Sequence, residues 1–204
     1  MCQGGTDVGQ YLVADKRVNL VSFAGSCNTV RQVGVAVQER FSKSILELGG
    51  NNALLIDESA NLKMALDAAL FGCIGTSGQR CTTMRRIIVH EKLYDQFVDA
   101  LVVKYQQLVS RIGHELELNT LVGPVHAQQN VENFKTAIQD AIKEGGSLAF
   151  GGKGEQLKGF LFSRVIFISH LKSGFSGLQF DKLTSSSKIN TFTDVVYKFF
   201  VCIV

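Results

Sequence analysis

The order of apolar segments near the start of the chain is the feature that most limits its fold. Residues 18–23 (VNLVSF) are apolar and β-branched, which predicts a buried strand. A glycine-serine turn and a helical pattern over residues 29–41 follow, and residues 44–48 (SILEL) predict a second strand. Strand, helix and strand in this order indicate a parallel sheet of the α/β class.

The same alternation of strands and helices continues beyond this first unit. Three amphipathic patterns predict helices, and three short apolar runs predict strands. The helices are expected over 61–74, 91–112 and 128–143, and the strands over 53–56, 86–89 and 147–150. Either Ser59 or Asn61 could cap the first of these helices, and Gly145 is expected to end the last.

Composition excludes several classes of protein. A net charge of +3 is too small to favour nucleic acid as a partner. Five cysteines without a C-x-x-C pair argue against a disulfide framework and a zinc site, and the four histidines show no ligand spacing, so we expect no metal. The apolar C-terminal run is too short to cross a membrane, and no signal segment opens the chain, so we expect a cytoplasmic protein.

A cysteine in the stretch GQRCTT is the first candidate for chemistry. Cys81 follows a glycine turn and precedes a predicted strand, where a nucleophile is exposed and turn amides can bind an oxyanion. The neighbouring Arg80 carries a charge that favours a thiolate. A small packing thiol in an ordinary turn is the alternative.

A carboxylate that interrupts an apolar strand is the second candidate. Glu47 lies in SILEL just before two glycines, where partial removal from water would suit it to general-base work. The alternative is an edge strand whose glutamate faces water. The third candidate is the turn at Gly25 and Ser26, since a turn between strand and helix can direct helix amides at a phosphate.

Read together, the strings SFAGS, LELGGNNA and GQRCTT resemble the aldehyde dehydrogenase superfamily in both order and spacing. The resemblance is continuous from about residue 18 to residue 152 and includes the stretch LVGP at 121–124. Within the superfamily, the chain looks most like the antiquitin branch, which oxidises α-aminoadipic semialdehyde.

The resemblance implies roles for individual residues. Cys81 matches the family nucleophile, whose backbone N–H also helps to hold the oxyanion, and Glu47 matches the base that activates water. Arg80 lies where antiquitin-like enzymes place a cation near the far carboxylate of the substrate. The cofactor would be NAD, which accepts the hydride, with contacts at the positions that match Gly25, Ser26, Leu48 and Gly49.

The implied fold is a partial aldehyde dehydrogenase fold of the α/β class. We expect residues 1–50 to be the end of a Rossmann-like NAD domain and residues 51–159 to be part of a catalytic domain. We expect residues 160–204 to be a tail without family resemblance, and the chain to be a truncated form. Val30 stands where the family usually has glycine, so it could crowd the cofactor.

Two other functions fit the same residues. The chain could be an inactive isoform that binds full-length subunits, or Cys81 could be a redox-sensing thiol. For the enzyme, the expected partners are a small-molecule aldehyde and further subunits, either of its own kind or full-length. A full-length form could be mitochondrial.

Overall fold

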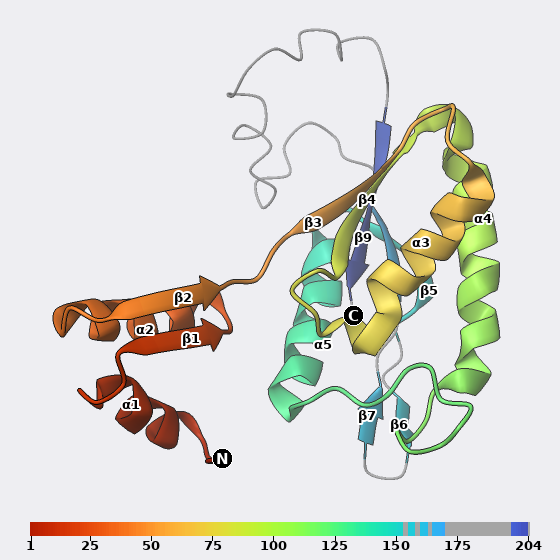
Figure 1. The fold of residues 1–204 in the computed structure, drawn as a ribbon. Helices are drawn as coiled ribbons and strands as arrows, with labels where there is room; N and C mark the ends of the chain where they lie inside the picture. Colours follow the sequence, from red (N-terminus) through yellow and green to blue (C-terminus); the bar gives the residue numbers. More distant parts are fainter. Residues whose placement is uncertain (153–154, 158–159, 163–164, 170–196, 204) are drawn as a thin grey trace, which may run out of the picture. The chain divides into compact units, whose positions relative to one another are not determined.

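The computed structural model describes residues 1–152, 155–157, 160–162, 165–169 and 197–203 (Figure 1). The chain divides into two compact units, Met1–Gly50 and Asn51–Val204, which are called unit 1 and unit 2 below. Each unit is described by itself.

Unit 1 is built on one β-α-β crossover. Its elements are α1 (Thr6–Ala14), β1 (Leu20–Ala24), α2 (Cys27–Glu39) and β2 (Lys43–Glu47). Strands β1 and β2 pair in parallel from Leu20 opposite Lys43 to Ala24 opposite Glu47, which confirms the predicted order and direction. Helix α1 was not predicted, because it buries no residue and therefore lacks a clear apolar stripe.

Helix α2 forms because its ends and its buried face are both specified by sequence. The Ser26 hydroxyl accepts a hydrogen bond from the Thr29 backbone N–H and so caps the helix. Val30, Val33 and Val37 are buried at spacings of three and four residues, which lie on one face of a helix. That stripe packs helix α2 against the other elements of unit 1.

Unit 2 holds a mixed five-stranded sheet in the order β3-β4-β9-β8-β5. Only β3 and β4 pair in parallel, whereas β9 and β8 run antiparallel to their neighbours. The expectation of a parallel sheet is therefore correct for one pair of this sheet. The strands are β3 (Asn52–Ile56), β4 (Met84–His90), β5 (Ser147–Gly151), β8 (Val165–Ser169) and β9 (Tyr197–Ile203).

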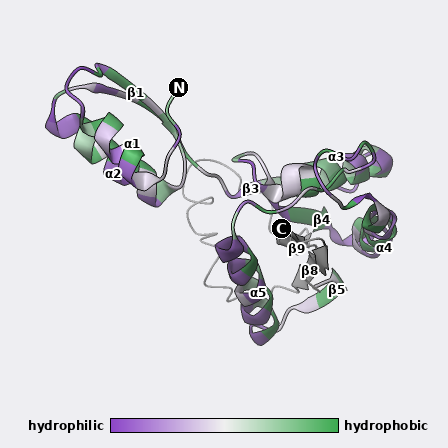
Figure 2. Ribbon diagram, turned by 90° about the horizontal axis from the view of Figure 1, so that it is seen from below, coloured by the Kyte–Doolittle hydropathy of each residue, from purple (hydrophilic) through white to green (hydrophobic). Residues whose placement is uncertain are grey.

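Helices cover both faces of this sheet (Figure 2). Helices α3 (Leu62–Ile74) and α4 (Glu91–Leu108) pack on β3 and β4 around one core. Helix α5 (Gln128–Lys143) lies on the opposite face, where Phe134 and Ile138 form a small second cluster. The largest fully buried side chains include Phe97, Leu101 and Tyr105 of α4, so this helix anchors the core.

Most predicted elements occur within two residues of their expected bounds, and one does not. The pattern over 91–112 predicted a single helix, but α4 ends at Leu108 and a 3-10 turn, η2 (Val109–Arg111), follows. Ile112 then pairs with Val122 in an isolated bridge, which draws the chain away from the helix axis. Helix α5 has the predicted bounds, and Gly145 follows it with φ of +89°, a conformation that favours glycine.

The segment from residue 160 contributes strands to unit 2. Strands β6 (Glu155–Leu157) and β7 (Phe160–Phe162) pair with each other, while β8 and β9 lie within the main sheet. Unit 2 therefore continues past the boundary expected after residue 159. The serine cluster at 185–187 lies outside the described residues.

The described part of the chain has neither a membrane-crossing helix nor a cluster of metal-binding side chains. No helix there has the length and apolar character that a membrane crossing needs. No group of three or more histidine, cysteine or acidic side chains there has the spacing of a metal site.

The packing of unit 2 predicts that shortening a buried side chain lowers the free energy of unfolding far more than shortening an exposed one. Phe97 is fully buried on α4, so Phe97→Ala should lower the free energy of unfolding by about 3–5 kcal/mol through lost burial and a residual cavity. Val103 is 51% exposed on the same helix, so Val103→Ala should change it by less than about 0.5 kcal/mol. Urea unfolding followed by circular dichroism compares them, and equal losses would contradict the packing described here.

Candidate functional site

The five predicted site residues of unit 1 lie at one edge of its parallel strand pair. Because β1 and β2 are parallel, the turn after β1 and the segment after β2 leave the sheet on the same side. The Gly25 backbone N–H donates to the Glu47 carbonyl oxygen at 3.1 Å, which ties the two segments together. Ligands of open α/β sheets bind at this carboxyl edge. Ser26, Leu48 and Gly49 adjoin this pair in sequence.

Glycine at position 25 is required by crowding. A Cβ there would lie 2.6 Å from the Phe23 ring, so a larger residue would displace that ring. The Gly25 N–H is already bonded to Glu47 and the Thr29 N–H to Ser26. Helix geometry leaves the N–H groups of Cys27 and Asn28, in the first turn of α2, without an intrahelical acceptor. These amides, two and three residues after the predicted Gly25, are the donors suited to an anion.

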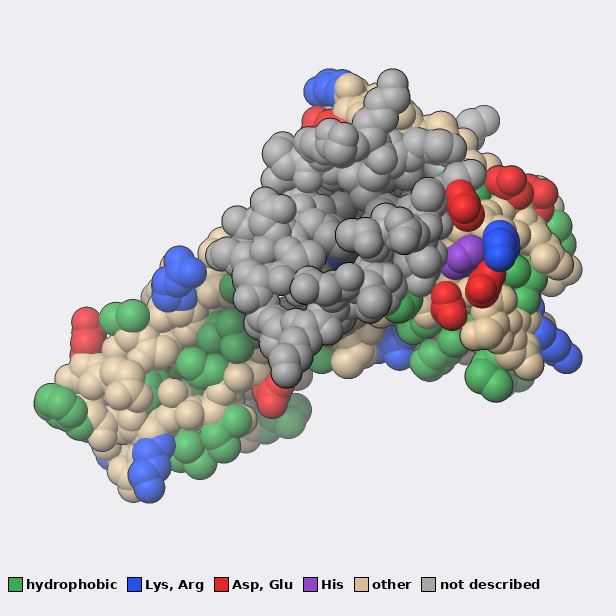
Figure 3. Space-filling view, turned by 90° about the horizontal axis from the view of Figure 1, so that it is seen from above, with side chains coloured by type: hydrophobic (Ala, Val, Ile, Leu, Met, Phe, Trp, Pro, Cys, Tyr) green, Lys and Arg blue, Asp and Glu red, His purple; other side chains and the backbone are tan. Residues whose placement is uncertain are grey.

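Glu47 differs from its expected environment. The structure has it exposed at the end of β2, as in the alternative of a glutamate that faces water, and not partly removed from water. The alternation of the strand explains this, since Ser44 and Leu46 occupy the half-buried face while Lys43, Ile45 and Glu47 share the other. Leu48 and Gly49 are exposed as well. Figure 3 shows hydrophobic side chains on the surface of unit 1. The exposed hydrophobic residues of this unit include Ile45 and Leu48.

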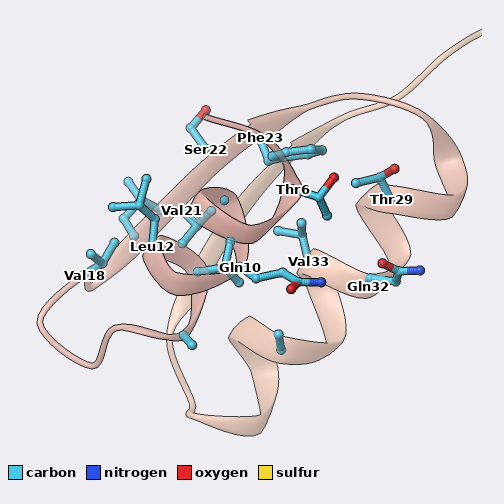
Figure 4. Close-up of a pocket in the computed structure, with 16 residues that line it drawn as sticks. Thr6, Gln10, Leu12, Val18, Val21, Ser22, Phe23, Thr29, Gln32 and Val33 are labelled. Carbon is cyan, nitrogen blue, oxygen red and sulfur yellow. The ribbon is translucent and has the colours of Figure 1, made fainter. Parts of the chain in front are cut away.

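A cavity of about 810 Å³ lies between α1, β1 and α2 (Figure 4), and none of the five predicted site residues lines it. Its lining is mainly apolar, with Val21 and Phe23 from β1 and Val33 from α2. Thr6, Gln10 and Gln32 add polar groups. Sequence reasoning missed the cavity because α1 was not predicted, although the glycines at 5 and 9 that line it were a signal. Val30, expected to crowd a cofactor, is buried and does not line the cavity.

The predicted nucleophile of unit 2 lies in a short hydrogen-bonded turn. Cys81 is exposed, between the 3-10 segment η1 (Gly75–Gly78) and the start of β4. The Thr83 N–H donates to the Arg80 carbonyl oxygen at 3.1 Å, and the Arg80 N–H donates to the Thr83 hydroxyl oxygen at 3.1 Å. These reciprocal bonds close the turn around Cys81, and the exposed-thiol expectation agrees with the structure.

The segment that precedes this turn is conformationally strained. Thr76 and Ser77 both have φ of +54°, and Gly78 follows with φ of +69°. Non-glycine residues rarely adopt this region, and such strain gathers at functional sites. The Ser77 hydroxyl donates to the Gly123 carbonyl at 2.6 Å, and Gln79 accepts from the His126 N–H at 2.7 Å. The LVGP stretch and the residues after it thus hold the strained segment in place.

Arg80 makes contacts that the sequence did not predict. Its guanidinium donates to the Phe71 carbonyl oxygen at 2.9 Å and lies 4.6 Å from the centroid of the Phe71 ring. A side chain at Gly75 would collide with the guanidinium, so this glycine makes room for it. These contacts join the turn around Cys81 to the end of α3. These contacts give Arg80 a structural role in holding the turn. Its role toward a substrate carboxylate stays a prediction.

The structural task of Arg80 is testable by substitution. Arg80→Gln should lower the free energy of unfolding of the chain by about 1 kcal/mol, because it removes a charge-assisted hydrogen bond and a cation–π contact. Arg85→Gln, in strand β4 that follows the turn, is the matched control and should lower the free energy of unfolding by less. Urea unfolding measures both variants. Unchanged stability in Arg80→Gln would contradict the task assigned here.

The chain is similar to a known protein family and to several known proteins. The aldehyde dehydrogenase family model matches residues 1–173, which includes the start of the segment expected to be unrelated. A putative aldehyde dehydrogenase family 7 member A1 homolog from Caenorhabditis elegans is 53% identical over 150 residues, 74% of this chain and 28% of that protein. An α-aminoadipic semialdehyde dehydrogenase from Rattus norvegicus is 49% identical with the same coverage of both chains.

The fold agrees with this relationship. Betaine aldehyde dehydrogenase from Staphylococcus aureus, solved in complex with NAD+, superimposes with a TM-score of 0.73 at 30% identity. The match covers 79% of this chain and 32% of that one. The chain thus spans about 28% of the length of the curated relatives named above. Family model, sequence relatives and fold agree, and the chain belongs to the aldehyde dehydrogenase family.

Proposed function

We propose that this chain carries the reacting residues of an NAD-dependent oxidation of an aldehyde to a carboxylic acid. The observation that carries the proposal is the exposed Cys81 thiol in a turn fixed by reciprocal hydrogen bonds and preceded by a strained, braced segment. A packing cysteine needs none of these features. The relatives are dehydrogenases by name, which gives no support to a non-catalytic isoform.

The first step assigned to this chain is addition of the thiol to the substrate. The Cys81 sulfur, as thiolate, forms a bond to the aldehyde carbon, and the carbonyl π electrons move to the oxygen. The backbone N–H of Cys81 stabilises that oxyanion. When the oxyanion re-forms its C=O bond, hydride leaves the carbon and a thioester to Cys81 remains. Bound NAD+ supplies the acceptor for that hydride.

The second step assigned to this chain is hydrolysis of the thioester. Glu47 takes a proton from a water molecule as the water oxygen adds to the thioester carbon. The carbon–sulfur bond then breaks, which releases the carboxylic acid and returns the Cys81 thiolate. The exposed position of Glu47 gives it access to water, and its carboxyl edge is the one where ligands bind in α/β folds.

Unit 1 has features that fit a dinucleotide. The cavity of about 810 Å³ falls within the range of ligand pockets, roughly 300–1,000 Å³. Its apolar walls suit an aromatic base, and Thr6, Gln10 and Gln32 can hydrogen-bond a base or a ribose. The amides at the start of α2 suit a phosphate. Gly49 is exposed, and a Cβ there would meet nothing within 4 Å, so its place beside a nicotinamide rests on the family resemblance.

The names of the relatives favour one class of substrate. We infer an aldehyde that carries a distant carboxylate, as α-aminoadipic semialdehyde does, since one relative bears that name. Arg80 would supply the complementary charge, as predicted from its position beside Cys81. Residues 1–50 would then form part of the NAD domain and residues from 51 part of the catalytic domain, with further subunits as partners.

Cofactor binding can be tested by filling the cavity of unit 1. Gly9 lines it, and a Cβ there would meet nothing within 4 Å, so Gly9→Leu should occupy the cavity without a clash. We expect the Kd for NAD+ to rise at least about tenfold, since a leucine side chain excludes the ligand sterically. Calorimetric titration of NAD+ into the 204-residue chain measures this. Tyr11→Leu, on the same helix outside the cavity, should bind as the parent does, and unaltered affinity in Gly9→Leu would refute the assignment.

The catalytic roles can be separated by thiol labelling and turnover. Iodoacetamide should alkylate Cys81 faster than Cys27, which is exposed too, and much faster than the buried Cys73. Cys81→Ser should abolish NADH formation from aldehyde and NAD+, measured at its absorbance band. Glu47→Gln should slow turnover by about 10²–10⁴-fold through loss of the base, whereas Glu39→Gln serves as control. Equal alkylation of Cys81 and Cys27, together with full turnover in Cys81→Ser, would exclude the proposal.

A further inference from the structure

The turn that holds Cys81 receives a second set of hydrogen bonds, from a different strand. The side-chain amide nitrogen of Asn52 donates to the Cys81 carbonyl oxygen at 2.7 Å and to the Thr83 carbonyl oxygen at 3.1 Å. Asn52 is the first residue of β3, whereas Cys81 and Thr83 lie in the last three residues before β4. The contact therefore links two segments that are 29 residues apart in sequence.

The register of the sheet explains how Asn52 reaches the turn. Asn52 lies opposite Met84 and Ala53 opposite Arg86, so the register shifts by one residue between Asn52 and Ala53. Irregularities of this kind re-aim a side chain at the end of a strand. Asn52 is half-buried, so its two hydrogen bonds are only partly exposed to competing water.

We propose that Asn52 is a positioning residue for the Cys81 thiol, an inference that rests on the proposed role of Cys81 as nucleophile. A bond to the Cys81 carbonyl fixes the peptide plane between Cys81 and Thr82. With the bonds between Arg80 and Thr83, it leaves the turn a single backbone arrangement. The thiol and the N–H of Cys81 are attached to that arrangement, so Asn52 sets their direction without touching the substrate.

The chemistry of the carboxamide explains why asparagine suits this position. Its NH2 group has two hydrogens, one for each carbonyl oxygen, at the end of a short side chain. Aspartate has the same shape but is acceptor-only when ionised, so it would repel both carbonyls. Leucine keeps the volume without any donor, and serine keeps one donor. We therefore expect the alkylation rate of Cys81 to fall with the number of donors at position 52, from asparagine to serine and then to leucine and aspartate.

The experiment measures alkylation of Cys81 by iodoacetamide in the full chain, with Cys27 of unit 1 as the reference thiol. Asn52→Asp and Asn52→Leu should lower the Cys81 rate about tenfold relative to Cys27, as expected when a pair of hydrogen bonds that orders the turn is lost. Asn52→Ser should recover part of the rate. Hydrogen exchange should speed up at residues 80–83 in the first two variants and remain unchanged in α4.

Asn51→Asp is the matched control, because it adds the same charge one residue away and the Asn51 contact to Arg86 uses its backbone carbonyl. It should leave both readouts unchanged. If Cys81 reacts faster than Cys27 in the parent and keeps the same advantage over Cys27 in the Asn52 variants, the positioning role is wrong and the proposed function stands. If the parent shows no preference for Cys81, both fall. Should Asn52→Leu not fold, Asn52→Ser and Asn52→Asp decide by the same ranking.

Discussion

The parallel pairing of β3 with β4 is the constraint on which the turn that holds Cys81 depends. Parallel neighbours cannot be joined by a tight turn, so the chain must cross over between them, here through α3. Gly72 near the end of α3 packs so closely on Met84 that a Cβ would lie 2.6 Å from its sulfur. This contact fixes where the helix ends relative to β4. The segment between them has only a few residues in which to return, and Cys81 lies on that return.

A similar constraint arranges unit 1, with a different outcome. There β1 and β2 are also parallel and are joined through α2, but the residues of interest lie at the strand ends. The bond from the Gly25 N–H to the Glu47 carbonyl brings the turn and the residue proposed as the base to one edge. One crossover thus presents amides and a carboxylate on strand ends, and the other presents a thiol on the returning loop.

Sequence reasoning succeeded where the signal is local. The Asn61 cap, offered beside Ser59, the α5 helix and the exposed cysteine follow from neighbouring residues, and the structure agrees with them. It failed where the environment depends on elements that are distant in sequence or weakly patterned. The exposure of Glu47 depends on which face of β2 is covered, and the cavity depends on α1. The contacts of Arg80 with Phe71 require knowledge of where α3 ends, which no spacing in the sequence provides.

Three separate elements hold the turn around Cys81, and none of their contacts is strong alone. Phe71 holds Arg80 from α3, Asn52 holds the carbonyls from β3, and Gly123 and His126 hold the strained segment from a loop. A hydrogen bond of this kind contributes only about 1 kcal/mol net, whereas left-handed backbone at two non-glycine residues costs about 1–3 kcal/mol each. The strain therefore persists only because several contacts act together. Removing one should loosen the turn locally before it unfolds the unit, since the core on α4 is separate from these contacts.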